Sequence, residues 1–118
     1  MSALARAEHT VQVSFEFPGR PAIHVAVGMN EAIELTGVKH PYKVQFWVHG
    51  GLAKAKLEFD EDAVEGRRTI TAIDGVRNGP EGTWVYFVDN VRSRYHINTQ
   101  TAPTVRSIRF VFEETRQP

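Results

Sequence analysis

The regular alternation of apolar and polar residues is the feature that most constrains how this chain can fold. One run near the start carries apolar residues at every second position: Val11, Val13, Phe15 and Phe17. A second run does the same after a Pro-Gly-Arg-Pro sequence at 18–21: Ile23, Val25 and Val27. A period of two is typical of strands that bury one face. Because Pro and Gly between two such runs mark a turn, the pattern predicts a β-hairpin over 10–27.

Short apolar runs continue along the chain and predict further strands at 44–49, 54–59, 69–73, 83–88, 95–97 and 106–112. The acidic segment 60–66 is interpreted as a loop. The only predicted helix runs from Asn30, as its N-cap, to Gly37 at its C-terminal end. We therefore expect an α+β fold, with a mostly antiparallel or mixed sheet of about seven strands and one short helix.

The length of 118 residues fits one domain, and no Pro- or Ser-rich linker divides the chain. We expect a disordered segment at 1–8 and a single domain over 9–118, with an extended segment at 42–66. Arg6 and Glu8 interrupt the apolar run that a secretory leader needs, which predicts a cytoplasmic location, or a secreted one if a leader was removed. No stretch approaches the roughly 20 apolar residues of a membrane span, so no membrane partner is expected.

Charge is balanced overall, with fourteen Lys and Arg residues against fourteen Asp and Glu residues. This balance disfavours a nucleic-acid partner bound through bulk positive charge, and the absence of cysteine excludes disulfides and thiolate metal sites. The distribution is uneven, because 58–65 holds five acidic residues and no base. Residues 90–110 hold no acid and four arginines: Arg92, Arg94, Arg106 and Arg109. Such an uneven surface could steer a partner or favour a homo-oligomer, and arginines near Tyr95 could contact an anionic ligand. The alternative is that these charged residues are ordinary solvated side chains without a binding role.

Two motifs in the second half resemble one known family. Residues 73–79 read IDGVRNG and residues 84–90 read WVYFVDN. They resemble the I-x-G-V/I-x-N and W-x-Y-x-V-N motifs of the transcobalamin C-terminal-like family, and 107–113 is similar to its closing I-x-F-x-F strand. The resemblance implies a β-grasp-like fold and a general habit of ligand binding rather than cobalamin carriage. The chain departs from the family where it has Val-Asp-Asn at 88–90 instead of Val-Asn-Gly, and in its extended segment at 42–66.

Two interpretations of these motifs stay open. The Asp-Gly and Asn-Gly pairs at 74–75 and 78–79 suit turns with positive φ, which Gly adopts without steric cost. Trp84 and Tyr86 share one face of their strand, where aromatic rings bury large areas. In one interpretation the motifs are a turn and a core strand. In the other, Trp84 and Tyr86 face a ligand.

Five histidines raise the question of a metal site: His9, His24, His40, His49 and His96. No two of them are spaced as His-x-His or His-x₃-His, so no metal is predicted. Convergence of three of them in the folded chain, His24, His49 and His96, stays open as an alternative.

The segment 47–51, Trp-Val-His-Gly-Gly, also allows a functional and a structural interpretation. Trp47 and His49 share one face of the predicted strand, and the glycine pair would let a ligand approach the backbone closely. The functional interpretation is an aromatic wall beside a group that exchanges protons near neutral pH. The structural alternative is a strand that ends in a hairpin turn.

These residues favour a non-catalytic domain that binds a small molecule or a protein partner and needs no cofactor. The candidate ligand-binding residues are Trp47, His49, Trp84, Tyr86, Asn90 and Tyr95. The alternative is a small cofactor-free enzyme, of cyclase, isomerase or hydrolase type, in which a pocket histidine pairs with a carboxylate, such as His49 with Asp74 or Asp89. The sequence lacks a nucleophile elbow, a Walker loop and a dinucleotide fingerprint. A third hypothesis is a structural subunit that adds a strand edge to its partner.

Overall fold

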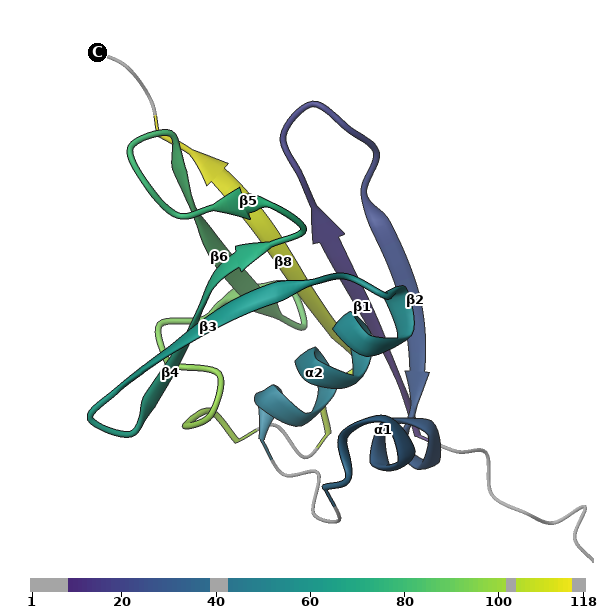
Figure 1. Ribbon diagram of the computed structural model, residues 1–118. Coiled ribbons are helices and arrows are strands. Elements are labelled where there is room, and N and C mark those ends of the chain that lie inside the picture. Colours follow the sequence, from purple (N-terminus) through teal and green to yellow (C-terminus); the bar gives the residue numbers. More distant parts are fainter. Residues whose placement is uncertain (1–8, 39–42, 102–103, 116–118) are drawn as a thin grey trace, which may run out of the picture.

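A computed structural model describes residues 9–38, 43–101 and 104–115. The chain has an α+β fold with a five-stranded sheet, a three-stranded sheet and two helices (Figure 1). The predicted fold class is therefore confirmed at this level, whereas the prediction of a single helix is wrong. The predicted disordered segment 1–8 and His40 lie outside the described residues.

The large sheet contains both ends of the described chain. Its strands, in spatial order, are β2 (Ile23–Gly28), β1 (Thr10–Glu16), β8 (Ser107–Glu114), β6 (Gly82–Val88) and β7 (Val91–Arg92). The central pair β1 and β8 is parallel, and every other neighbouring pair is antiparallel. The structure confirms the predicted hairpin over 10–27 and the strands predicted at 83–88 and 106–112.

One face of this sheet forms the core. The central strands place Val13 beside Ile108 and Phe15 beside Phe110, and all four side chains are almost fully buried. Each large apolar side chain buried in this way stabilises the fold by about 1.5–3 kcal/mol relative to an exposed one. The alternation of apolar and polar residues thus fixes which face of the sheet points inward.

The helix α1 (Met29–Thr36) follows β2 directly and confirms the predicted helix, but its N-cap is Gly28 and the predicted N-cap at Asn30 is wrong. Gly37 ends it in the left-handed conformation, with φ at 74°, and donates its N–H to the carbonyl of Ile33 at 2.8 Å. Ala32 is fully buried. The Lys54 ammonium lies 2.9 Å from the Glu31 carboxylate and lowers the pKa of that carboxyl group, which ties α1 to the second helix.

The second helix, α2 (Val44–Ala55), replaces the predicted strand at 44–49, which is wrong. Apolar or small residues recur at three- and four-residue intervals and are buried: Val44, Trp47, Val48, Gly51 and Leu52. This is the spacing of one helix face. An alternation over only six residues cannot tell a strand from a helix that is buried on most sides. The helix packs against α1, β1 and β2 (Figure 1).

Gly50 and Gly51 were expected to end a strand, and instead they let α2 approach its neighbours closely. A Cβ atom on Gly51 would lie 2.8 Å from Cγ1 of Val13 in β1. A Cβ atom on Gly50 would lie 3.2 Å from Cβ of Ala32 in α1. Two glycines inside a helix each cost roughly 0.5–1 kcal/mol relative to alanine, and here they permit close packing of helix against sheet.

The small sheet consists of β3 (Phe59–Val64), β4 (Arg67–Ile73) and β5 (Val76–Arg77). The acidic segment expected as a loop is therefore mostly strand β3, and the strand predicted at 54–59 is wrong because α2 extends to Ala55. Glu65 and Gly66, with φ at 52° and 76°, form a two-residue turn between β3 and β4. This is the backbone that a type I′ hairpin requires.

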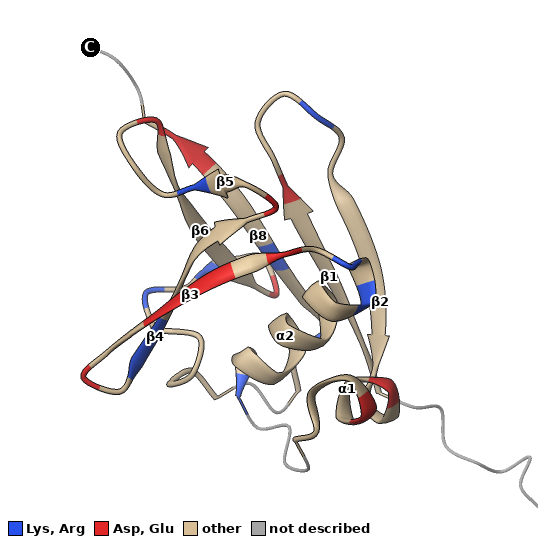
Figure 2. Cartoon of the chain, in the orientation of Figure 1, with Lys and Arg blue, Asp and Glu red and all other residues tan. Residues whose placement is uncertain are grey.

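Acidic and basic residues meet across this sheet rather than lying apart (Figure 2). Asp60 lies 2.5 Å from Arg77, and Glu61 lies 3.1 Å from Arg68. The uneven charge in the sequence is thus partly cancelled by pairing between strands. An exposed pair such as Asp60 with Arg77 contributes only about 0–1 kcal/mol.

The strand predicted at 95–97 is also wrong, because this segment leads into a turn. The amides of Thr99 and Gln100 donate to the carbonyl of His96. The amide of Gln45, in the first turn of α2, donates to the carbonyl of Ile97 at 2.9 Å. The segment 95–97 therefore caps α2 instead of extending a sheet. Local sequence pattern cannot predict this contact, because Gln45 and Ile97 are far apart in the chain.

Candidate functional site

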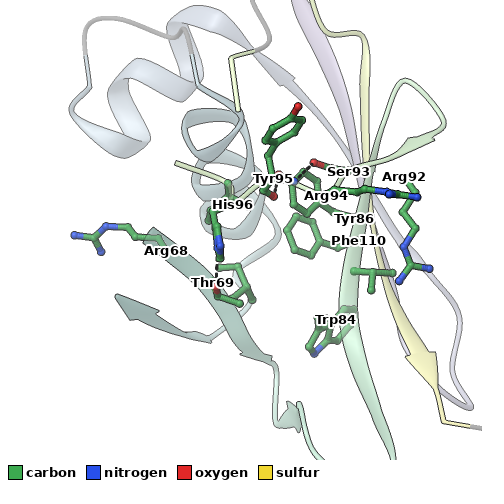
Figure 3. A pocket seen from close by; sticks show the side chains of 13 residues that line it. Arg68, Thr69, Trp84, Tyr86, Arg92, Ser93, Arg94, Tyr95, His96 and Phe110 are labelled. Carbon is green, nitrogen blue, oxygen red and sulfur yellow. Dashed lines mark hydrogen bonds between the residues drawn. The ribbon is translucent and has the colours of Figure 1, made fainter. Parts of the chain in front are cut away.

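A cavity of about 200 Å³ lies between the two sheets. Strands β6 and β8 of the large sheet form one wall, β4 of the small sheet contributes another, and the segment 92–97 completes it. Figure 3 shows the thirteen lining residues, with the rings of Trp84, Tyr86 and Phe110 projecting from the large sheet.

Three rigid aromatic rings form what we call the aromatic floor: Trp84, Tyr86 and Phe110. The Tyr86 and Phe110 rings are stacked, with centroids 5.2 Å apart and planes inclined by 14°. Trp84 packs edge-on against Phe17 and Phe112 on its other sides. Each floor residue has at most 7% of its surface exposed. These rings are held by packing, so a ligand would meet a preformed apolar surface.

The Tyr86 hydroxyl fixes the segment that closes the cavity. It donates a hydrogen bond to the carbonyl of Tyr95 at 2.6 Å, and Gln100 Oε1 lies 3.2 Å away. Burial raises the pKa of Tyr86, which keeps the phenol protonated and able to donate. Ser93 Oγ in turn accepts the amide N–H of Tyr95 and contacts Gln100. The backbone of 93–95 is therefore anchored to the aromatic floor.

Trp84 and Asn78, one residue from each of the two motifs described above, connect the sheets. Asn78 Oδ1 accepts the backbone N–H of Trp84 at 2.7 Å, and its amide group donates to the carbonyl of Ile70 at 3.3 Å. The Trp84 indole N–H donates to the carbonyl of Val76 at 2.8 Å. These bonds support the interpretation of the motifs as a turn and a core strand. They also hold β6 and β4 at the spacing that leaves the cavity open.

The turn at 74–75 has the backbone that its sequence predicts. Asp74 and Gly75 both have positive φ, at 48° and 85°, and together connect β4 to β5. The pair at 78–79 does not behave in this way, because neither residue has positive φ. The second motif ends in a similar turn, where Asp89 and Asn90 have φ values of 47° and 69°. Asn90 thus takes the left-handed position for which the family pattern has Gly.

The charge around the cavity is one-sided. Among the described residues that line it there are three arginines and one histidine, and no Asp or Glu. Arg68 is paired with Glu61 at 3.1 Å, and Arg92 is paired with Glu113 at 2.7 Å. Arg94 makes no ion pair with any described residue. One positive charge at the cavity therefore lacks a carboxylate partner.

Thr69 and His96 supply further polar groups of the cavity. Thr69 Oγ1 lies 3.1 Å from Nδ1 of His96, and the two residues come from β4 and from the closing segment. In the view of Figure 3 they lie on the other side of the aromatic floor from Arg92. The cavity thus has apolar rings at its floor and polar groups on both sides.

The structure brings three of the six predicted ligand-binding residues together. Trp84, Tyr86 and Tyr95 line the cavity, and the other three do not. Trp47 is 1% exposed and packs edge-on against Phe46 in the core. Asn90 is exposed in the turn between β6 and β7.

His49, the remaining predicted residue, lies on α2 and pairs with a carboxylate outside the cavity. Its Nε2 is 2.8 Å from Oε1 of Glu61 in β3, and its ring packs against Phe59. The suggested pairs with Asp74 and Asp89 are wrong. Asp74 binds Arg20 at 3.1 Å.

Asp89 instead accepts two backbone N–H groups, from Arg106 and Ser107. It therefore holds the start of β8 and has no histidine partner among the described residues.

Sequence reasoning missed Arg68, Thr69 and Phe110 as cavity residues. Thr69 and Arg68 carry no motif, and they reach the cavity only because β4 packs across β6. Phe110 looked like a core residue because it alternates with polar neighbours in its strand. The arginine-rich segment containing Arg92 and Arg94 was the one available signal for the charged side.

Another hollow, of about 290 Å³, also has the segment 92–95 in its lining. It is lined by Val88, Val91 and Gln100 in addition to that segment. Val91 and Tyr95 are 69% and 68% exposed. This part of the surface therefore offers apolar side chains beside arginines.

In residues 9–38, 43–101 and 104–115, no three His, Asp or Glu side chains are grouped as a metal site requires. His24 lies on β2, His49 on α2 and His96 in the closing segment, so these three do not converge. None of the helices in this part of the chain is long and apolar enough to span a membrane.

Comparison with models of known protein families and with curated proteins gives no match to this chain. The function is therefore argued from the geometry of the cavity.

Proposed function

We propose that this chain is a non-catalytic binding domain whose small-molecule ligand occupies the cavity over Trp84, Tyr86 and Phe110. The observation that carries the proposal is a rigid aromatic floor beneath an arginine-bearing rim with no carboxylate among its described residues. Binding sites for small molecules are typically apolar hollows with a few placed polar groups. The lining offers no carboxylate to pair with His96, so the ring lacks the partner that acid–base catalysis commonly uses.

The volume of the cavity limits the size of the ligand. A dry cavity of about 150 Å³ in another protein accommodates benzene, so about 200 Å³ suits a single ring with a small substituent. A corrin is far too large to be enclosed here. The cavity therefore supports a ligand other than cobalamin.

The β-grasp label and the transcobalamin-like relationship are part of the same proposal. A first hairpin followed by a helix, with β1 and the last strand parallel at the centre of the sheet, supports a β-grasp-like topology. The relationship to the family rests on the motifs at 73–79 and 84–90. Both motifs have structural roles in this chain, so a protein could share them with the family and still bind a different ligand.

The test is a screen of single-ring compounds by two-dimensional amide NMR, on the unaltered chain and on two variants at Thr69. Thr69→Trp places a large side chain at the cavity wall, whereas Thr69→Val removes the hydroxyl with little change of volume. The proposal expects compounds that shift the cavity resonances of the unaltered chain and of Thr69→Val, but not those of Thr69→Trp. Compounds that bind all three proteins equally, or a screen with no hits, would contradict it.

A protein partner is the second form that binding could take, and the exposure of Val91 and Tyr95 favours it. Both side chains lie beside the cavity and the second hollow. Replacing them together by serine should then weaken capture of the partner without changing the amide NMR spectrum of the cavity floor. An unchanged affinity for the partner in that double variant would remove this surface from the account.

An enzymatic function is favoured by one observation, the pairing of His49 with Glu61. A histidine held by a carboxylate is the arrangement that activates a general base. Hydrolysis of p-nitrophenyl acetate provides a test, with His24→Gln as the control for an exposed histidine. A rate that falls only in His49→Gln would support the enzyme, and equal rates in both variants would remove His49 from catalysis.

A further inference from the structure

We infer that the cavity selects a flat, single-ring ligand with one negative charge, of the aromatic carboxylate class, and that Arg94 binds that charge. The inference rests on the proposed function, because it names the ligand class of the same cavity. It follows from charge balance, from the anchoring of the Arg94 backbone and from the shape of the aromatic floor.

Charge balance sets the number of negative charges that the ligand carries. Of the three arginines at the cavity, Arg68 and Arg92 already have carboxylate partners, Glu61 and Glu113. Arg94 alone has no ion-pair partner among the described residues. A single carboxylate on the ligand would give Arg94 an ion-pair partner, and a guanidinium can bind a carboxylate with two parallel hydrogen bonds.

The backbone on either side of Arg94 is anchored at the cavity. Its neighbours Ser93 and Tyr95 are linked to each other by a hydrogen bond, and the carbonyl of Tyr95 accepts from the Tyr86 hydroxyl. The charged side chain therefore starts from a backbone that is tied to the aromatic floor. Fixing this backbone before binding lowers the entropy that is lost when the ligand binds.

The aromatic floor determines the shape of the uncharged part. Tyr86 and Phe110 lie almost parallel, and Trp84 continues the same apolar surface along β6. A flat ring can stack on such a surface or meet it edge-on, and both arrangements are favourable for aromatic pairs. A ligand with an apolar ring and one charged end matches a floor of rings with one free cation at its edge.

A phosphorylated ligand fits less well. A phosphate monoester carries about −1.5 to −2 charges at neutral pH, whereas only one of the three cavity arginines lacks an ion pair within the described part of the chain. Binding it fully would require Arg68 or Arg92 to leave its carboxylate. We therefore expect phenyl phosphate to bind no more tightly than benzoate.

The experiment compares benzoate, its neutral analogue benzamide, and phenyl phosphate by amide and indole NMR titration at constant ionic strength. The proteins are the unaltered chain, Arg94→Gln and the control Arg106→Gln. Arg106 is an exposed arginine that does not line the cavity. Because a charge-assisted pair contributes strongly, benzoate should bind about ten-fold more tightly than benzamide. Arg94→Gln should remove that difference, and Arg106→Gln should keep it.

The outcomes separate this inference from the proposed function. Equal affinities for benzoate and benzamide, or equal effects of the two arginine variants, would overturn the inference while leaving a ligand-binding cavity. Phenyl phosphate binding ten-fold more tightly than benzoate would overturn the single negative charge. If none of the three compounds shifts the Trp84 indole resonance or the amides of 84–86, both the inference and a single-ring ligand in this cavity are wrong.

Discussion

His49 and Glu61 join α2 to β3 across 2.8 Å, between Nε2 and Oε1. The second oxygen of the same carboxylate lies 3.1 Å from Arg68 on β4, and Arg68 lines the cavity. The pair is only partly exposed, with 27% of the His49 side chain and 10% of the Glu61 side chain in contact with solvent. One carboxylate thus connects the helix, the small sheet and the wall of the candidate site.

Replacing Glu61 by alanine should therefore loosen the small sheet. Loss of the contacts to His49 and Arg68 at a carboxylate that is only 10% exposed should lower the free energy of unfolding by about 1–3 kcal/mol. Hydrogen exchange of the β3 and β4 amides should also become faster. Asp62 is the matched control, because it is an exposed acid in the same strand with no partner among the described residues. Equal stabilities of Glu61→Ala and Asp62→Ala in chemical denaturation would contradict this role.

Asn78 connects the two sheets, and its removal should be costly. Asn78→Ala leaves the Trp84 N–H and the Ile70 carbonyl without their side-chain partner, and each unpaired group costs about 1–3 kcal/mol if it stays buried. Asn78→Asp keeps an acceptor for the Trp84 N–H and should retain part of that stability. Urea denaturation of both variants provides the measurement. A loss below about 0.5 kcal/mol for Asn78→Ala would show that the bonds do not hold the sheets together.

Gly51 should resist a substitution that usually stabilises a helix. Gly→Ala in a helix normally gains up to about 1 kcal/mol. Here the new Cβ would lie 2.8 Å from the side chain of Val13, so we expect a net loss of about 1–3 kcal/mol from overpacking. The loss should be smaller in a Val13→Ala background, because the two sites share one contact. A thermal shift to higher temperature for Gly51→Ala alone would contradict the close approach of α2 to β1.

Tyr86 should make stability depend on pH in the alkaline range. Burial raises the pKa of Tyr86 above the ordinary value near 10. The unfolded chain therefore releases this proton first as the pH rises. The contribution to stability is complete below about pH 10 and is lost as the pH rises through the pKa of the folded state.

Tyr86→Phe should remove that part of the alkaline decline, at a cost of about 1 kcal/mol at neutral pH for the lost bond to the Tyr95 carbonyl. Tyr95, which is 68% exposed, provides the control. Tyr95→Phe should keep the decline. Identical pH profiles for the unaltered chain and Tyr86→Phe, measured by urea denaturation from pH 7 to 11, would contradict the burial argument.

The sequence predicts the large sheet well because its signal is local. Val11, Val13 and Phe15 alternate cleanly, and Gly37 ends α1 in the conformation that glycine favours. Around Trp47 the alternation of apolar and polar residues predicts a strand, whereas the structure has the helix α2. The first two turns of α2 are buried on most sides and leave only a narrow polar stripe at Gln45 and His49. The close packing that requires Gly50 and Gly51 is a property of the assembled fold.

Only some of the cavity residues can be predicted from the sequence, because the others carry no local signal. Trp84 and Tyr86 stand out as two aromatic residues on one face of a strand, and Arg94 lies in a segment without acids. Thr69 and Arg68 could not be predicted, because they enter the site only through packing of the small sheet against the large one. His49 meets the carboxylate of Glu61 rather than that of Asp74 or Asp89, because β3 forms where the acidic segment predicts a loop.

The central claim is that a single-ring ligand binds over Trp84, Tyr86 and Phe110. The most direct measurement is the set of intermolecular nuclear Overhauser effects between benzoate protons and the protein in a saturated complex. The account predicts contacts from the benzoate ring to all three aromatic rings. Contacts confined to other residues, such as Val91 in the second hollow, or no contact with the aromatic floor at any benzoate concentration, would contradict it.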